Sequence, residues 1–117
     1  MRYYAYGDIT LKHTGWVEEY LRTINSFIEK HGGRILSRTI RMEKLEGSRD
    51  LPTNVILIEF PDRSSALDFF DDPDYQPLRS LRRDGSTSEF TLFPAEDLAL
   101  MKPPPRGRPN AADPARA

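Results

Sequence analysis

Few side chains in this sequence could carry out acid/base chemistry. The chain has no cysteine and 2 histidines, His13 and His31, so a thiol nucleophile and the usual cysteine type of zinc site are excluded. Histidine has an ordinary pKa of about 6.5, and a neighbouring carboxylate can hold its tautomer. His31 and Glu59 are therefore predicted to be catalytic, as a general acid/base pair. In the structural alternative, His31 caps the helix before it and Glu59 forms an ion pair with Arg34.

Other polar side chains could bind a substrate. Tyr4 and Arg34 are expected beside the catalytic pair, where either could stabilise an enolate or a phenolate. Tyr75 and Arg79 would share one face of a helix, and with Asp8 they could line a cleft that holds a carboxylate or a hydroxyl. The alternative is that Tyr75 packs in the core while Arg79 joins the acidic residues at positions 71, 72 and 74.

Other reaction classes lack their motifs. Gly32-Gly33 does not have the spacing of a dinucleotide or phosphate-binding loop, and no Gly-x-Ser-x-Gly elbow occurs. His13 and His31 lie at opposite ends of one predicted helix, about 27 Å apart, which excludes a two-histidine metal site within one subunit. We therefore predict no metal and no cofactor, haem included.

Composition narrows the class of protein further. The chain has 117 residues, with Lys+Arg 17 against Asp+Glu 18 and a net charge of -1, so no basic field favours nucleic acid or an anionic membrane. No apolar run approaches the roughly 18 residues of a membrane span, and the start lacks a signal peptide. A cytoplasmic protein is expected. Half of the 10 prolines fall in residues 96–117, which predicts a flexible tail after a folded domain at residues 1–95.

The hydrophobic pattern alternates between strand and helix. A helix is expected from Trp16 to His31, with Thr14 as its N-cap and Gly32-Gly33 as its end. Asp62 is the expected N-cap of the next helix. The order is βαββαβ, a ferredoxin-like α+β fold with an antiparallel 4-1-3-2 sheet and its helices on one face. The expected strands are Tyr3 to Leu11, Arg34 to Leu45, Val55 to Phe60 and Phe90 to Phe93, and a short third helix is expected from about Asp74 to Arg83.

This strand order has two consequences. It brings the C-terminal end of the third strand beside the start of the first two, so His31, Arg34, Glu59 and Tyr4 should cluster. It also leaves one sheet face, with Tyr4 and Tyr6, uncovered by helices. An apolar face of this size should not face water. We therefore expect a homodimer in which two sheets pack face to face as a dimeric α+β barrel.

Four segments, in order, carry a resemblance to a known family: Lys30-His31-Gly32-Gly33-Arg34, Leu45-Glu46-Gly47, Ile58-Glu59-Phe60-Pro61 and Asp72-Pro73-Asp74-Tyr75-Gln76-Pro77-Leu78-Arg79. Over roughly Tyr3 to Pro94 the chain resembles the domain of unknown function 1330 family of the dimeric α+β-barrel superfamily. The resemblance implies the fold and a homodimer, but no established reaction. His13-Thr14 replaces the usual Asp-Pro at the start of the first helix, and the proline-rich tail is a second departure.

Two functions remain open from the sequence. The first is a cofactor-independent enzyme that acts on a small aromatic or carbonyl metabolite by His/Glu acid/base chemistry, by analogy with enzymes of the superfamily. The second is a non-catalytic dimer that binds a small ligand or serves as an accessory protein. The reaction, the substrate and the role of the tail do not follow from the sequence.

Overall fold

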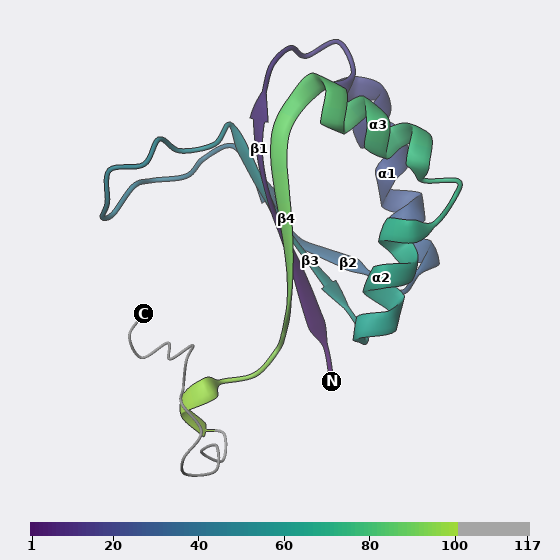
Figure 1. Cartoon of the computed structure of the whole chain (residues 1–117), viewed down its shortest axis with the longest axis vertical. Helices are drawn as coiled ribbons and strands as arrows, with labels where there is room; N and C mark the ends of the chain where they lie inside the picture. Colours follow the sequence, from purple (N-terminus) through teal and green to yellow (C-terminus); the bar gives the residue numbers. More distant parts are fainter. Residues whose placement is uncertain (101–117) are drawn as a thin grey trace, which may run out of the picture.

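A four-stranded antiparallel sheet forms one layer of the protein, and three helices cover one of its faces (Figure 1). The structure is a computed structural model that describes residues 1–100. The sheet order is β2-β3-β1-β4, which confirms the predicted ferredoxin-like topology. The strands are β1 Tyr3–Leu11, β2 Arg34–Thr39, β3 Asn54–Phe60 and β4 Ser86–Pro94, and the helices are α1 Val17–Lys30, α2 Arg63–Asp71 and α3 Gln76–Gly85.

Helix α1 shows why its sequence folds as predicted at one end and differently at the other. The N–H of Gly33 donates to the carbonyl of Ile28 at 2.9 Å, and the N–H of Gly32 donates to that of Glu29 at 2.9 Å. Gly32 has a φ of 78°, which a side chain would disfavour, so the two glycines form the predicted stop. The N-cap is Trp16, without a side-chain cap bond, rather than the predicted Thr14.

Helices α2 and α3 together fill the second helical position of the fold. Asp62 caps α2 as predicted, because its carboxylate accepts the backbone N–H of Ser65 at 2.8 Å. The chain turns at Asp72 and Pro73, and α3 then begins with Pro77 in its first turn, where a missing N–H costs nothing.

The core lies between the helices and the sheet. Alternation along the strands points Ala5, Ile58 and Phe60 at the helices, where they are buried. From the helices, Ile28 and Phe69 are buried against them, each at most 2% exposed. The other buried apolar residues are Trp16, Tyr20, Ile24, Ile56, Ala66, Tyr75 and Leu78.

Two glycines permit close contacts in this core. A Cβ on Gly85 would lie 2.1 Å from the indole nitrogen of Trp16, and that nitrogen donates to the Gly85 carbonyl at 3.1 Å. A Cβ on Gly7 would lie 2.3 Å from the ring of Phe90. Any larger residue at either position would displace an aromatic ring from the core.

Two predicted strand boundaries were wrong. Strand β2 ends at Thr39 rather than Leu45, with an irregularity between Ile35 and Ser37. The segment 40–53 then extends away from the sheet on the side opposite the helices (Figure 1). Strand β4 begins at Ser86, four residues before the predicted start, because its polar first half pairs with β1 throughout. Pairing with a central strand overrides the weak propensity of Ser and Thr there.

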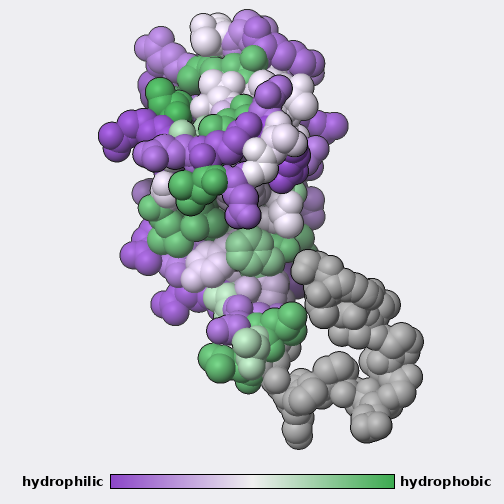
Figure 2. Space-filling view, turned by 90° about the vertical axis from the view of Figure 1, so that its left-hand side faces the viewer, coloured by the Kyte–Doolittle hydropathy of each residue, from purple (hydrophilic) through white to green (hydrophobic). Residues whose placement is uncertain are grey.

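The second face of the sheet carries no helix within residues 1–100. Tyr4 lies opposite Phe93 and Glu59, and Tyr6 lies opposite Leu57, so these side chains share this open face. Tyr6 is 38% exposed and Phe93 is 41% exposed. Figure 2 shows hydrophobic groups spread over this side, with hydrophilic groups between and around them.

The predicted tail lies mostly outside the described residues. Its described start contains one turn of 3-10 helix, Leu98–Leu100, with both leucines exposed. Within residues 1–100, the helices are all too short or too polar to cross a membrane.

Candidate functional site

A cavity of about 510 Å³ lies between α1 and the helix-facing side of the sheet. Its wall is mainly aliphatic and aromatic, and it includes the chain's single tryptophan, Trp16. The exposed lining residues Leu21, Ile40 and Arg41 mark where it reaches the surface, beside the root of segment 40–53. No Asp, Glu, His or Lys of the described chain is among its lining residues. A cavity of this size and polarity suits a small apolar molecule.

Tyr20 and Tyr75, two of the residues that line the cavity, are paired through their hydroxyls. Tyr20 on α1 and Tyr75 before α3 are 8% and 1% exposed, and their hydroxyl oxygens lie 3.3 Å apart. Burial raises the pKa of Tyr20 above its ordinary value, with a smaller contribution from Tyr75, whereas Arg82 acts in the opposite direction. Tyr20 therefore keeps its proton and is a hydrogen-bond donor at neutral pH.

Asn54, at the start of β3, also lines the cavity, as do Arg38, Thr39 and Arg41. The side-chain oxygen of Asn54 is buried and accepts no hydrogen bond within residues 1–100. A buried acceptor of this kind costs free energy until a donor reaches it. The cavity thus offers an unused acceptor and a pair of phenols within one apolar wall.

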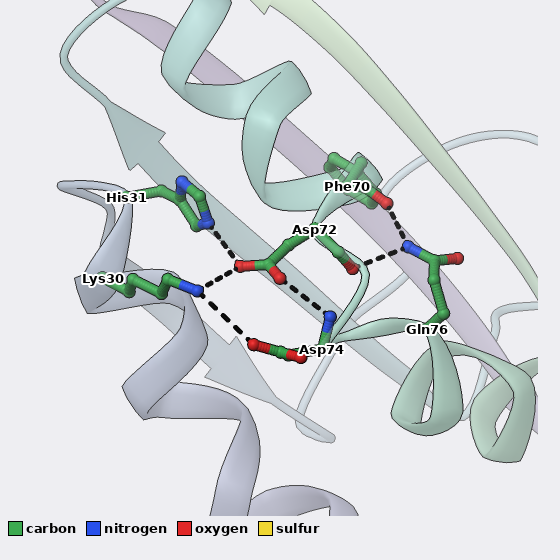
Figure 3. A network of polar contacts seen from close by, with 6 residues as sticks. All are labelled: Lys30, His31, Phe70, Asp72, Asp74 and Gln76. Carbon is green, nitrogen blue, oxygen red and sulfur yellow. Dashed lines mark hydrogen bonds and ion pairs between the residues drawn. The ribbon is translucent and has the colours of Figure 1, made fainter.

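His31 lies outside this cavity and bonds a carboxylate other than the predicted one. Its Nε2 is 2.8 Å from Oδ2 of Asp72, which Nζ of Lys30 also approaches at 2.9 Å (Figure 3). The prediction that Glu59 is the partner of His31 was therefore wrong. The His31 ring is 18% exposed and packs against Phe69, with ring centroids 6.3 Å apart.

Asp72 joins the end of α1 to the turn between α2 and α3. Its other oxygen accepts the backbone N–H of Asp74 at 2.9 Å. The side-chain amide of Gln76 donates to the carbonyls of Phe70 and Asp72 (Figure 3). The hydrogen bond from His31 and then that from Lys30 hold the pKa of Asp72 well below its usual range. This network accounts structurally for much of the motif that begins at Asp72.

Glu59 lies on the open sheet face. Its carboxylate forms ion pairs with Arg34 at 3.0 Å and with Arg2 at 3.3 Å, and its residue pairs with Tyr4 of β1. The predicted cluster therefore divides: Tyr4, Arg34 and Glu59 come together, while His31 bonds Asp72 on the helix side. The prediction that all four residues cluster was wrong because strand order fixes the end of the sheet at which a residue lies. It does not fix the face of the sheet from which the side chain projects.

The second predicted group also divides. Asp8 lies on the open face, opposite Val55 and Glu89. Tyr75 is in the core, stacked on Phe69 with centroids 4.5 Å apart. Arg79 donates to the carbonyl of Phe70 at 3.1 Å rather than joining the acidic residues.

Sequence reasoning missed three residues near the cavities: Tyr20, Asn54 and Arg82. Tyr20 lies among the apolar residues on the buried face of α1, and its sequence neighbours do not indicate that its hydroxyl contacts Tyr75. Arg82 stands in a run of arginines, a pattern that usually indicates a solvated face, yet it is 3% exposed. Its i,i+4 spacing from Leu78, a buried residue, is the signal that could have found it.

No cluster of three or more His, Asp or Glu side chains placed to hold a metal ion occurs in residues 1–100.

The protein has a ferredoxin-like α+β fold, as shown by its sheet order, its connectivity and the position of its helices α1, α2 and α3 on one face of the sheet. Residues 2–95 match the family described as Domain of unknown function (DUF1330). The chain belongs to this family, which confirms the resemblance seen in the sequence. Comparison with curated protein sequences finds no match.

Solved structures share the fold at low identity. SnoaB, a cofactor-independent oxygenase from Streptomyces nogalater, is 18% identical with a TM-score of 0.61, covering 86% of this chain and 98% of that one. The RPA0582 protein of unknown function from Rhodopseudomonas palustris is 16% identical with a TM-score of 0.66, covering 82% and 84%. A dimeric ferredoxin-like protein of unknown function from Jannaschia sp. CCS1 is 9% identical with a TM-score of 0.58, covering 81% and 100%.

Proposed function

We propose that this protein is a homodimer that binds, in each protomer, a small aromatic metabolite bearing a carbonyl or phenolic oxygen. The cavity between α1 and the sheet carries the proposal. Its mainly apolar wall fits an aromatic body, and the Tyr20 and Tyr75 hydroxyls, which bond each other, leave one proton to donate to a polar atom of the ligand. The unused oxygen of Asn54 would accept a hydroxyl or amine of the same ligand.

Recognition of an oxygen by buried phenols would be selective. A ligand carbonyl exchanges its hydrogen bond from water for one from the Tyr20 hydroxyl, whereas a hydrocarbon of the same shape gains no such bond. The difference is the net value of one buried hydrogen bond, about 1 kcal/mol or roughly fivefold in affinity.

The open sheet face supports the dimer. Tyr4, Tyr6, Leu57 and Phe93 share it, and the neighbour from Jannaschia is a dimeric protein of the same fold. Segment 40–53 extends on the same side and carries Leu45, which is 93% exposed. Covering these apolar groups against a second copy removes them from water. Light scattering after size exclusion should give about twice the 13.5 kDa of one chain, and a monomer would contradict the dimer.

Titration with acetophenone, with ethylbenzene as the matched hydrocarbon, tests the ligand proposal. The single Trp16 lines the cavity, so its one indole resonance in a nitrogen-15 NMR spectrum reports occupancy. We expect saturable shifts with both molecules and tighter binding of acetophenone. Tyr20→Phe should reduce that preference and leave ethylbenzene binding unchanged. Equal binding of the two molecules by the parent protein would contradict recognition of the oxygen.

Catalysis in the same cavity is the second candidate function. It is favoured by SnoaB, whose fold performs an oxygenase reaction without a cofactor, and by the neutral phenol of Tyr20, which can donate to an enolate. The acid/base roles proposed for His31 and Glu59 would require a substrate outside this cavity, since neither lines it.

Exchange of the acetophenone methyl protons in deuterated water separates these cases. In the cavity, water would have to take the methyl proton while Tyr20 donates to the enolate oxygen, because no Asp, Glu, His or Lys of residues 1–100 lines it. Acceleration by the protein that survives His31→Ala and Glu59→Gln but falls with Tyr20→Phe would place the chemistry in the cavity. Acceleration lost with His31→Ala and Glu59→Gln would return the chemistry to the predicted acid/base residues. No acceleration would leave the non-catalytic binding function.

A further inference from the structure

A second hollow, of about 370 Å³, lies between α2, α3 and β4 and is lined by Arg79, Arg82 and Arg83. The hydroxyl residues Ser88 and Thr91 also line it. Its other walls are apolar, formed by Leu67, Phe70, Phe90 and Leu92. No carboxylate of residues 1–100 lines this hollow.

Two of the three arginines have unsatisfied donors. Arg82 is only 3% exposed, and Arg79 is half-buried. The Nε atoms of both are buried and donate to no partner within residues 1–100. No salt bridge within the described chain joins either guanidinium to an Asp or Glu, although Arg2, Arg22 and Arg34 all have one.

The bonds that these two arginines do make are to neutral groups. Nη1 of Arg79 donates to the Phe70 carbonyl at 3.1 Å, and Nη1 of Arg82 donates to the hydroxyl of Ser88. The Arg82 guanidinium also stacks over Phe90 at 4.5 Å from the ring centroid. These contacts orient the two groups but leave their charge without a counter-charge. A buried charge is normally paired, and an unpaired one is costly.

We propose that this hollow binds a small organic carboxylate, held by the guanidinium groups of Arg79 and Arg82. Guanidinium N–H groups match the two oxygens of a carboxylate, and charge-assisted bonds of this kind are about twice as strong as neutral ones. Apolar walls beside the charges favour a carboxylate with an aromatic or aliphatic body over a small inorganic anion. The lining of this hollow differs from that of the Tyr20 cavity, although Phe90 lines both and Arg82 also interacts with the Tyr20 hydroxyl.

Benzoate is the test ligand, and benzamide is the uncharged control of the same shape. Inorganic phosphate tests whether the hollow binds a small inorganic anion instead of an organic carboxylate. In the full-length protein, the Nε–H resonances of Arg79 and Arg82 should shift saturably with benzoate. Those of Arg22 and Arg63, exposed arginines that line neither cavity, serve as internal references. Benzamide should bind at least tenfold more weakly, and added salt should weaken benzoate binding because it screens the charges.

Arg79→Gln should lower benzoate affinity about tenfold or more, the value of one charge-assisted hydrogen bond. Arg63→Gln, an exposed arginine on α2, is the control and should leave the affinity unchanged. The resonance measurement on the parent protein keeps the test valid if a variant fails to fold.

Three results would overturn the proposal: benzamide binding as tightly as benzoate, no shift at the two Nε–H groups, or phosphate binding without benzoate. Donors already saturated by an acidic group of residues 101–117 or of a second copy would give the second of these results. Failure of acetophenone to bind would not affect this test, because its reporter and its residues are different.

Discussion

The paired hydroxyls of Tyr20 and Tyr75 predict a non-additive effect on stability. Tyr20→Phe leaves the hydroxyl of Tyr75 without its partner in a position that is 1% exposed. Loss of a hydrogen bond that leaves a buried partner unsatisfied costs about 1 to 3 kcal/mol. We expect a loss of about 2 kcal/mol in the free energy of unfolding for this variant.

Tyr75→Phe should cost less, about 1 kcal/mol, because Arg82 remains beside the hydroxyl of Tyr20. Removal of both hydroxyls leaves no unpaired phenol, and Arg82 loses the Tyr20 hydroxyl in both variants, so the double variant should be no less stable than Tyr20→Phe alone. The two single losses would add to about 3 kcal/mol, so the coupling free energy is about 1 kcal/mol.

Urea unfolding followed by circular dichroism, at one fixed protein concentration, measures these values. Tyr3→Phe is the control, because its hydroxyl makes no hydrogen bond within residues 1–100, and it should change stability by less than about 0.5 kcal/mol. Additive losses, or single losses as small as that of the control, would refute the view that the two hydroxyls satisfy each other.

Four further predictions concern Asp72, Gly85, Leu57 and the C-terminal segment. The pKa of Asp72 is lower in the folded protein than in the unfolded chain, so the ionised carboxylate stabilises the fold. This stabilisation is fully present at pH values above the ordinary carboxyl pKa and is lost as pH falls through the folded-state pKa. Asp72→Asn should therefore flatten the acid limb of a stability-versus-pH curve, while the exposed Asp68→Asn should not. Gly85→Ala should lower stability by about 1 to 3 kcal/mol in a thermal melt, because its Cβ would meet the indole of Trp16. Leu57→Asp should give monomers in light scattering, since this residue lies on the open face; a dimer would mean that assembly uses another surface. Removal of residues 96–117 should leave the melting temperature nearly unchanged, and a drop of many degrees would show that this segment contacts the folded part.

Much of the fold follows from the sequence because local signals and long-range pairing agree. The predicted β1, from Tyr3 to Leu11, has the bounds of the strand in the structure. Gly32-Gly33 ends α1 because two backbone hydrogen bonds and one positive φ require that turn. Asp62 caps α2 through a contact three residues away. Such features depend on neighbours along the chain, so they can be read from it.

The candidate site follows less well, since its contacts join residues far apart in sequence. Asp72 is 41 positions from His31, and its place among three aspartates at 71, 72 and 74 gives no sign of which one turns inward. Arg82 shows the same difficulty: a run of arginines usually faces solvent, and only packing of α3 against β4 buries one of them. A strand order predicts which residues lie at one end of a sheet, but His31 and Glu59 show that it does not bring them together.

The alternation of strand β3 has a consequence for how this protein can vary. Ile56 lines the cavity wall, and its neighbour Leu57 faces the open side, so at these two positions the sheet presents one side chain to each of two surfaces. A substitution at Ile56 or at Leu57 therefore affects only one of the two surfaces, whereas Val55 pairs with Asp8 of the open face and also lines the cavity. In a deep mutational library scored separately for ligand retention and for assembly, the columns for Ile56 and Leu57 should fall into different phenotypic classes. Lineages of this fold could exchange ligands without changing their subunit contacts, and change those contacts without losing their ligands.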